Sequence, residues 1–175
     1  TTSSGTSVSQ ATAAASSSQN QSKYEANVAS VAGKMDNRVI AAYQQLGFKL
    51  VVDPSVNYSG YFDARSRSIT MKQIDDSVYH ELGHFLAFIA GNVDKTASFQ
   101  SIFVAEKANV TAFNKAYVTQ NASEYFAESV KDYILNNASL KSSRPQTYAA
   151  VQNALNQITD AQIAKIQKIY GAFWN

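Results

Sequence analysis

The chain has 175 residues, of which 16% are charged, and its formal net charge is +2. This length suits one domain with its own apolar core and is too short for two ordinary domains. The lysines and arginines form no basic stripe, so the sequence predicts neither nucleic-acid binding nor attraction to an anionic membrane. The absence of cysteine excludes disulfides, thiolate metal sites and cysteine nucleophiles. No apolar run approaches the roughly 20 residues that a membrane-spanning helix needs.

Residues 1–22 consist almost entirely of Ser, Thr, Ala, Gln, Asn and Gly, and Val8 is the one sizeable apolar residue among them. Such a segment cannot bury enough surface to offset the entropy that it would lose on ordering. We therefore expect a flexible Ser/Thr-rich N-terminal segment at 1–22, followed by one domain at 23–175. A leader of this composition is more typical of secreted proteins than of intracellular ones.

The first third of the domain predicts a helix followed by a small sheet. Apolar residues recur at steps of three and four across 23–46, which favours an amphipathic helix, and Gly47 should end it. A short apolar strand is expected at 48–52. Two further β-like runs, 58–63 and 68–72, flank a polar bend and predict a hairpin.

The rest of the domain is predicted to be mostly helical. One helix should begin at the cap candidates Asp75, Asp76 and Ser77 and end near residue 90, before Gly91-Asn92. Weak helical patterns follow at 97–107 and 111–117. A capping box at 121–124 and the pair Arg144-Pro145 each predict the start of a further helix. Thr159-Asp160 should cap a last helix, whose Ile163, Ile166 and Ile169 are expected to face the core. This order of elements predicts an α+β fold, with a small mixed sheet and a helical C-terminal part.

The segment His80-Glu81-Leu82-Gly83-His84 carries the clearest chemical signal. Residues four apart on a helix stack on one face, so both imidazoles can reach the same metal ion. Glu81 lies about 100° round the helix from His80, where it can reach a water molecule at the open coordination position of a zinc ion. Both histidines of the chain fall in this segment, within a predicted helix. The pattern therefore indicates a zinc site with Glu81 as general base.

A catalytic zinc needs a third protein ligand. With no further His and no Cys, that ligand must be a carboxylate. The downstream choices are Asp94, Glu106, Glu124, Glu128, Asp132 and Asp160. Glu124 and Glu128 stand out because they are four residues apart on a predicted helix, so one can bind metal while the other orients a ligand histidine. Glu106 is the next choice.

The HELGH segment at 80–84, followed at a distance by Glu124-Tyr-Phe-Ala-Glu128, resembles the catalytic domain shared by anthrax lethal factor and the secreted Pro-Pro endopeptidases, a zincin family. The resemblance implies that Glu124 is the third zinc ligand and that Glu128 supports the site from behind the ligands. It also implies that Tyr117, seven residues before Glu124, stabilises the oxyanion.

The resemblance extends to the predicted hairpin and covers roughly residues 24–175, although only the HELGH and EYFAE segments are specific. It implies that an edge strand, assigned here to 68–72, holds an extended substrate antiparallel to itself by β-augmentation. A tryptophan expected near that strand is missing, because the single tryptophan is Trp174. The reaction class therefore carries over more fully than a preference for Pro-Pro bonds.

Together these features predict a secreted, extracellular zinc endopeptidase with one catalytic Zn²⁺. We expect it to act as a monomer on extended segments of proteins or peptides, proline-rich ones included, with no nucleic-acid partner and no insertion into a membrane. Two alternatives stay open: a zinc-binding interaction module without catalysis, and a toxin-like metalloprotease of other specificity. A helical domain with an accidental motif is a third alternative, and it predicts no bound zinc.

Overall fold

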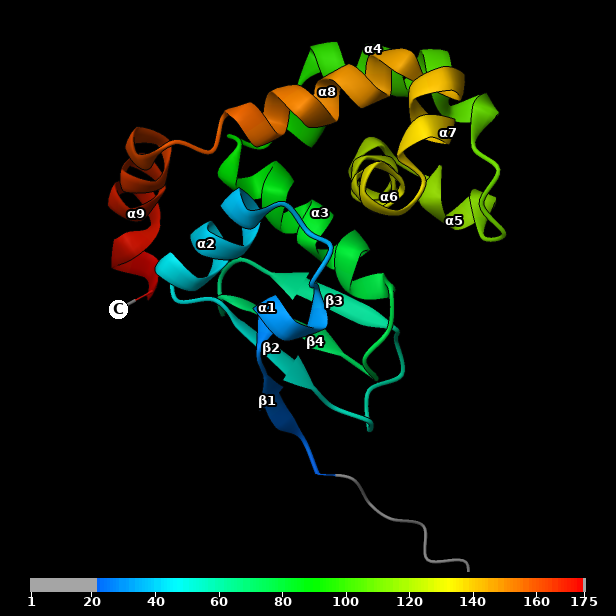
Figure 1. Ribbon diagram of the computed structural model, residues 1–175. Coiled ribbons are helices and arrows are strands. Elements are labelled where there is room, and N and C mark those ends of the chain that lie inside the picture. Colours follow the sequence, from blue (N-terminus) through cyan, green and yellow to red (C-terminus); the bar gives the residue numbers. More distant parts are fainter. Residues whose placement is uncertain (1–21, 175) are drawn as a thin grey trace, which may run out of the picture.

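A small mixed sheet lies beneath a layer of helices in the computed structural model, which describes residues 22–174 (Figure 1). The order of the strands is β1-β2-β4-β3. The strand bounds are β1 (Tyr24–Ala26), β2 (Lys49–Val52), β3 (Gly60–Asp63) and β4 (Ser68–Met71). The pair β1–β2 is antiparallel, β2–β4 is parallel, and β3–β4 is antiparallel. The predicted α+β fold with a small mixed sheet is confirmed.

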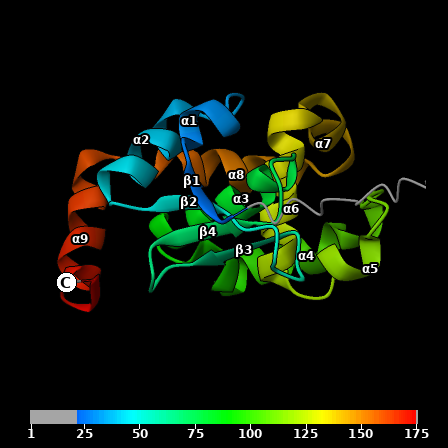
Figure 2. The ribbon, with the colours of Figure 1, turned by 90° about the horizontal axis from the view of Figure 1, so that it is seen from below.

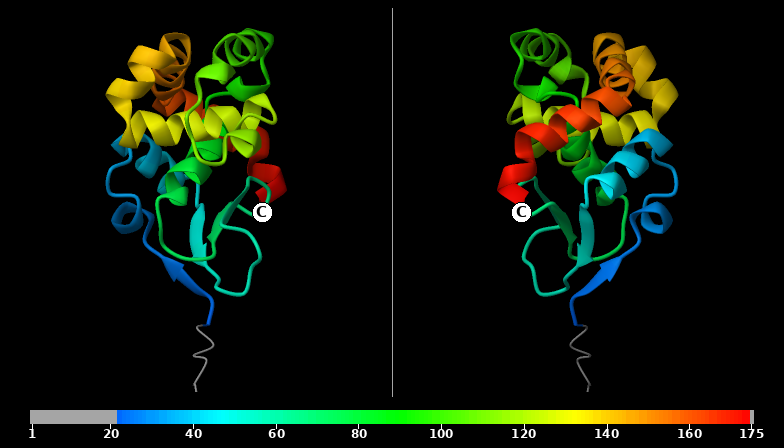
Figure 3. Two further views of the ribbon diagram at one scale, coloured as in Figure 1. Left: turned by 90° about the vertical axis from the view of Figure 1, so that its right-hand side faces the viewer. Right: turned by 90° about the vertical axis from the view of Figure 1, so that its left-hand side faces the viewer.

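The helices cover one side of this sheet (Figure 3). Their bounds are α1 (Val28–Val31), α2 (Asn37–Gln45), α3 (Ser77–Ile89), α4 (Ala97–Glu106), α5 (Lys115–Val118), α6 (Ala122–Leu135), α7 (Asn137–Ser143), α8 (Pro145–Asn156) and α9 (Asp160–Trp174), with 3₁₀ turns η1 (Val93–Lys95) and η2 (Lys107–Asn109). Within residues 22–174, none of the helices combines the length and the apolar character that crossing a bilayer requires. Most of the predicted segment 1–22 lies outside the described residues.

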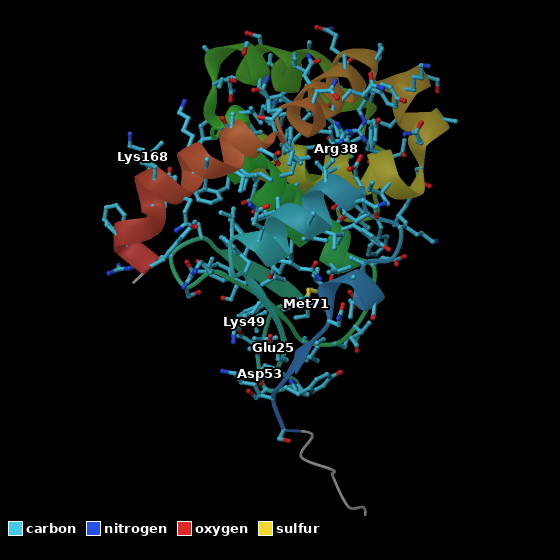
Figure 4. All side chains as sticks on the ribbon, turned by 60° about the vertical axis from the view of Figure 1, so that its left-hand side comes forward. Glu25, Arg38, Lys49, Asp53, Met71 and Lys168 are labelled. Atoms are coloured by element: carbon cyan, nitrogen blue, oxygen red, sulfur yellow. The ribbon has the colours of Figure 1, made fainter. Side chains whose placement is uncertain are left out.

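The prediction of one helix across 23–46 is wrong. The segment forms β1 and two short helices, because two polar side chains start new helices within it. Asn27 Oδ1 accepts from the backbone N–H of Ser30 at the start of α1, and Asp36 Oδ1 accepts from that of Arg38 at the start of α2. Figure 4 shows β1 beside β2, where the carboxylate of Glu25 lies 3.5 Å from the ammonium of Lys49.

The predicted strand at 48–52 and the hairpin are confirmed, but the assignment of 68–72 as the edge strand is wrong. β4 pairs on both sides, with β2 and with β3, so β3 rather than β4 is the edge strand of the hairpin, and β1 forms the other edge of the sheet. The reason is the burial of both apolar residues of β4: Ile69 and Met71 are fully buried. In β3, by contrast, Tyr61 is 58% exposed, which is typical of a strand at the border of a sheet.

Helix α3 is the central element of the fold. It packs on the sheet with one side and on α6 with the other, and almost all of its residues are buried. Gly91 and Asn92 end it with positive φ angles of 88° and 57°, as their residue types predict. Asn121 caps α6 by accepting from the backbone N–H of Glu124 at 2.8 Å. These residues set where α3 ends and where α6 begins.

Helix α9 packs at one end of the sheet, and α5 and α7 lie toward the other (Figure 2). Ile163 and Ile166 are buried as predicted, but Ile169 is 49% exposed. The buried stripe continues instead through Tyr170 and Trp174, which lie four and eight residues after Ile166 and follow the period of a helix. Both aromatic rings pack against Phe88, at centroid distances of 4.8 and 6.4 Å.

Candidate metal centre

Three predicted ligands converge between α3 and α6. Nε2 of His80 lies 2.9 Å from Oε2 of Glu124, and Nε2 of His84 lies 3.4 Å from Oε1 of the same carboxylate. One ligand atom from each residue can be chosen so that all lie within 4.8 Å of one another. Two imidazoles from one turn of α3 and a carboxylate from α6 thus surround one point in space.

The close crossing of α3 and α6 depends on Gly83, inside the HELGH segment. A Cβ atom added at Gly83 would lie 2.7 Å from Cα and from the carbonyl oxygen of Ala127. Real Cβ atoms do not approach a backbone this closely, so only glycine allows the two helices to cross here. Since Ala127 belongs to the EYFAE segment, this contact brings the two motifs within ligand distance.

Glu128 fixes the orientation of His80. Its Oε2 lies 2.7 Å from Nδ1 of His80, so Nδ1–H donates to the carboxylate and the lone pair of Nε2 points toward Glu124. A neutral imidazole nitrogen and a carboxylate are both acceptors, so a cation or a proton must lie between them. A donor set of two imidazoles and one carboxylate, backed by a second carboxylate on a ligand histidine, suits a catalytic zinc ion.

The charges of the site favour a cation. Burial acts to lower the pKa of His80, but hydrogen bonds to Glu124 and Glu128 outweigh it and raise this pKa to about 9. Burial opposes ionisation of Glu124 and Glu128, yet the pKa of both carboxyls is lowered, chiefly by their hydrogen bonds to His80. Both carboxylates are therefore ionised beside the imidazoles, and their negative charges can compensate the charge of a divalent cation.

Glu81 lies against the edge strand β3. It is 6% exposed, and burial raises the pKa of its carboxyl, while His80 and His84 act to lower it. A hydrogen bond from the backbone of Phe62 also acts to lower the pKa of Glu81. A Cβ atom added at Gly60 would lie 2.8 Å from Cγ of Glu81, so the side chain fits only because β3 has glycine there. A buried carboxylate with a raised pKa is suited to proton transfer near neutral pH.

Tyr117 reaches the site from α5 on the opposite side. Burial, followed by the charges of Glu124 and Glu81, raises the pKa of its phenol, which also hydrogen-bonds to Glu124. The ring is 54% exposed and lines a cavity of about 480 Å³ together with Tyr58, Ser59, Gly60, Ser77, His80, Glu81, Asn114, Glu128 and Lys131. The phenol is thus neutral and open to a molecule in the cavity.

The other carboxylates considered as ligands make contacts elsewhere. Glu106 accepts hydrogen bonds from the backbone N–H groups of Gln146 and Thr147, at 3.1 and 2.7 Å, and so caps α8. Asp94 accepts from the hydroxyl of Ser123 at 2.6 Å. Asp132 pairs with Arg144, and Asp160 lies in the first turn of α9.

Sequence reasoning missed the steric roles of two glycines. Gly83 lies within HELGH, and Gly60 lies within the run 58–63 of the predicted hairpin. A glycine inside a strand is a signal of close approach by another group, and Gly60 lies at the start of β3. The signal for Gly83 was weaker, because a buried helix crossing cannot be located from one sequence.

A helix with HELGH, a second helix with a facing glutamate and a mixed sheet with an open edge define an HExxH-type domain. Residues 64–154, more than half of the chain, match the family described as "Anthrax toxin lethal factor, N- and C-terminal domain". The chain belongs to this lethal factor family. It is also 40% identical over 78 residues to the Pro-Pro endopeptidase of Clostridioides difficile (strain 630), a match that covers 42% of this chain. The match spans about a third, 34%, of the length of that relative.

Proposed function

We propose that the protein is a secreted zinc endopeptidase that cuts extended segments of extracellular proteins, with proline-containing segments as the preferred class. The observation that carries this proposal is the convergence of His80, His84 and Glu124 around one point, with the carboxylate of Glu81 beside it. Membership of the lethal factor family and the name of the clostridial relative support peptidase activity.

His80, His84 and Glu124 would hold the zinc ion, and Glu128 would keep His80 in the tautomer that leaves Nε2 free. The bound ion would supply Lewis-acid activation of water and of the peptide carbonyl. Glu81 would accept a proton from the attacking water as the water oxygen bonds to the carbonyl carbon. The same carboxyl would then deliver that proton to the leaving amine as the C–N bond breaks.

Tyr117 would donate its phenolic proton in a hydrogen bond to the oxygen of the tetrahedral intermediate. Its raised pKa keeps the phenol protonated, so that it is a donor throughout the working pH range. Removing a donor of this kind from an oxyanion costs roughly 10² to 10³ in kcat. The position of Tyr117 opposite β3 leaves space for a peptide between them.

The edge strand β3 would hold the substrate by β-augmentation. Within residues 22–174 no strand pairs with its outer edge. An extended peptide at this edge gains main-chain hydrogen bonds on one side only, so a proline, which lacks an N–H, is tolerated wherever its nitrogen faces away. The preference for a proline pair rests on the name of the clostridial relative.

A peptide library tests the proposal. Dodecapeptides of mixed sequence, half of them with a central proline pair, are incubated with the zinc-loaded protein and with its Glu81→Ala variant, and mass spectrometry identifies the products. We expect cleavage by the unchanged protein alone, enriched at proline pairs. Cleavage elsewhere would favour a metalloprotease of other specificity. Zinc binding without any cleavage would favour the interaction module and contradict the proposal.

A further inference from the structure

The outward-facing groups of the edge strand can be assigned from its pairing. The backbone N–H of Lys72 donates to the carbonyl of Ser59 at 3.0 Å. Ser59 and Lys72 therefore form a hydrogen-bonded pair of the antiparallel ladder. Hydrogen-bonded pairs alternate along an antiparallel ladder, and the register therefore turns Tyr61 and Asp63 toward β4. Gly60, Phe62 and Ala64 turn their N–H and C=O groups outward.

The last of these outward acceptors is already occupied by the C-terminal helix. Nε1 of Trp174 donates to the carbonyl oxygen of Ala64 at 2.9 Å. The indole is held in place by Arg67, whose guanidinium carbon lies 5.3 Å from the ring centroid, and by an edge contact with Phe48 at 5.7 Å. The outer edge of β3 thus ends, for a pairing peptide, at Ala64.

Beyond that end lies an apolar hollow, here called the aromatic hollow. It has a volume of about 430 Å³ and is lined by Ala64, Arg65, Tyr170, Phe173 and Trp174. Phe173 is 76% exposed, an unusual position for a phenylalanine on a helix whose opposite side packs on the core. Figure 4 shows Lys168 of the same helix pointing away into solvent.

The aromatic hollow adjoins a second hollow that reaches the candidate metal centre. A smaller hollow of about 210 Å³ includes Phe62, Ala64 and the ligand His84 in its lining. Ala64 is shared by both hollows. A path of surface therefore runs from the metal ligands along β3 to Phe173, beside the outward groups of Phe62.

We propose that helix α9 sets a distal specificity site for the peptide substrate: Trp174 ends backbone pairing at Ala64, and the aromatic hollow binds an apolar side chain of the substrate. This inference rests on the proposed peptidase function. Gly60 abuts Glu81, and Ala64 lies four residues farther along the strand. An antiparallel peptide advances one residue per strand residue, about 13 Å over four. The bound side chain therefore belongs to a residue three to five positions before the scissile bond.

The peptide library reads out this position directly. Among peptides cut by the unchanged protein, we expect Leu, Ile, Phe, Tyr or Pro to be enriched three to five residues before the cut. Phe173→Ala should reduce that enrichment roughly fivefold to tenfold, since even one methylene in a pocket can decide a factor of ten. Its effect should fall on KM rather than kcat, because a remote contact is the same in the ground and transition states.

Ile169→Ala is the matched control, since Ile169 is exposed on the same helix and does not line the aromatic hollow. It should leave the preference unchanged. Both variants should keep the zinc content and melting temperature of the unchanged protein, because each removes an exposed side chain.

Trp174 supplies a second readout, because it is the single tryptophan of the chain. In the zinc-loaded Glu81→Gln variant, a cleavable peptide with Leu four residues before the cut should shift the tryptophan emission on binding. The same peptide with Gly at that position should bind more weakly and shift it less. Cleavage with no upstream preference, or a preference that survives Phe173→Ala, would overturn this inference and leave the peptidase function standing. No cleavage of any peptide would overturn both.

Discussion

Gly83 of α3 lies directly against the backbone of Ala127 of α6, the two helices that carry the site. A Cβ atom at Gly83 would lie 2.7 Å from the carbonyl oxygen of Ala127. The absence of a side chain at one position of HELGH thus determines how near Glu124 comes to His80 and His84. Binding of a metal ion at this site would be coupled in this way to the packing of α3, the central helix.

The first prediction is that Gly83→Ala weakens both the fold and the metal site. The added methyl group meets backbone rather than a flexible side chain, so α6 must shift, at a cost of about 1–3 kcal/mol in the free energy of unfolding. Zinc affinity should fall with it. Urea unfolding and zinc titration measure the two effects. Gly33→Ala is the control, since the atom nearest to its added Cβ would be 3.9 Å away. Equal stability and equal zinc affinity in Gly83→Ala and Gly33→Ala would contradict this account.

The second prediction separates Glu81 from the metal. In Gly60→Ala, the new Cβ would lie 2.8 Å from Cγ and 3.0 Å from Oε1 of Glu81. The flexible side chain can move away, so stability and zinc content should change little. A displacement of about 1 Å in a catalytic group can cost on the order of 10²-fold in rate. Peptide cleavage at saturating substrate checks this, and full activity of a folded Gly60→Ala protein would refute the placement of Glu81.

The third prediction distinguishes three glutamates by their metal content. Glu124→Gln should lose stoichiometric zinc on dialysis. Glu128→Gln should bind zinc 10- to 100-fold more weakly, as expected for a partner of a ligand histidine. Glu106→Gln should retain zinc but lose about 1–3 kcal/mol of stability, because its carboxylate caps α8. Elemental analysis of the dialysed variants measures their zinc content. Loss of zinc from Glu106→Gln, or retention of zinc in Glu124→Gln, would contradict the assigned roles.

The fourth prediction concerns pH. The pKa of His80 in the metal-free fold, about 9, lies above its ordinary value of 6.5, so protonated His80 stabilises that fold. This contribution, on the order of 3 kcal/mol, is fully present below pH 6.5 and is lost as the pH rises through 9. Chelator-treated protein should therefore unfold at lower urea concentration at pH 9.5 than at pH 6.5.

Zinc binding should depend on pH in the opposite direction. The ion must displace the proton of His80, so apparent affinity should rise up to about pH 9, with roughly one proton released at pH 7. Calorimetry in two buffers of different ionisation enthalpy measures that proton. In Glu128→Gln, the loss of one hydrogen-bonded carboxylate should lower the pKa of His80 and the number of protons released. Zinc affinity that is constant from pH 5 to pH 9 would contradict the site.

The local chemistry of the site could be predicted because it is encoded within single helices. The spacing of His80 and His84 and that of Glu124 and Glu128 each place two side chains on one helix face. The cap at Asn121 could be predicted for the same reason. What brings the two helices together is the contact of Gly83 with Ala127, 44 residues apart in the chain, which no local pattern reveals.

The errors of prediction arose where pairing over long distances decides the structure. The three residues of β1 form a strand because they pair with β2, while the helical spacing of their neighbours obscured it. β4 lies inside the sheet because of its parallel pairing with β2. Trp174 reaches the end of β3 across 110 residues of sequence. A tryptophan near that strand therefore exists, although no tryptophan is near it in sequence.

The proton transfer assigned to Glu81 is tested most directly by the zinc-loaded Glu81→Gln variant, measured for metal content and peptide cleavage in the same sample. The amide keeps the size of the side chain but cannot accept the proton of the attacking water. We predict one equivalent of zinc in both proteins, and cleavage by the unchanged protein that is lost in the variant. Turnover by a zinc-loaded Glu81→Gln protein, or failure of the unchanged protein to bind zinc, would contradict the account.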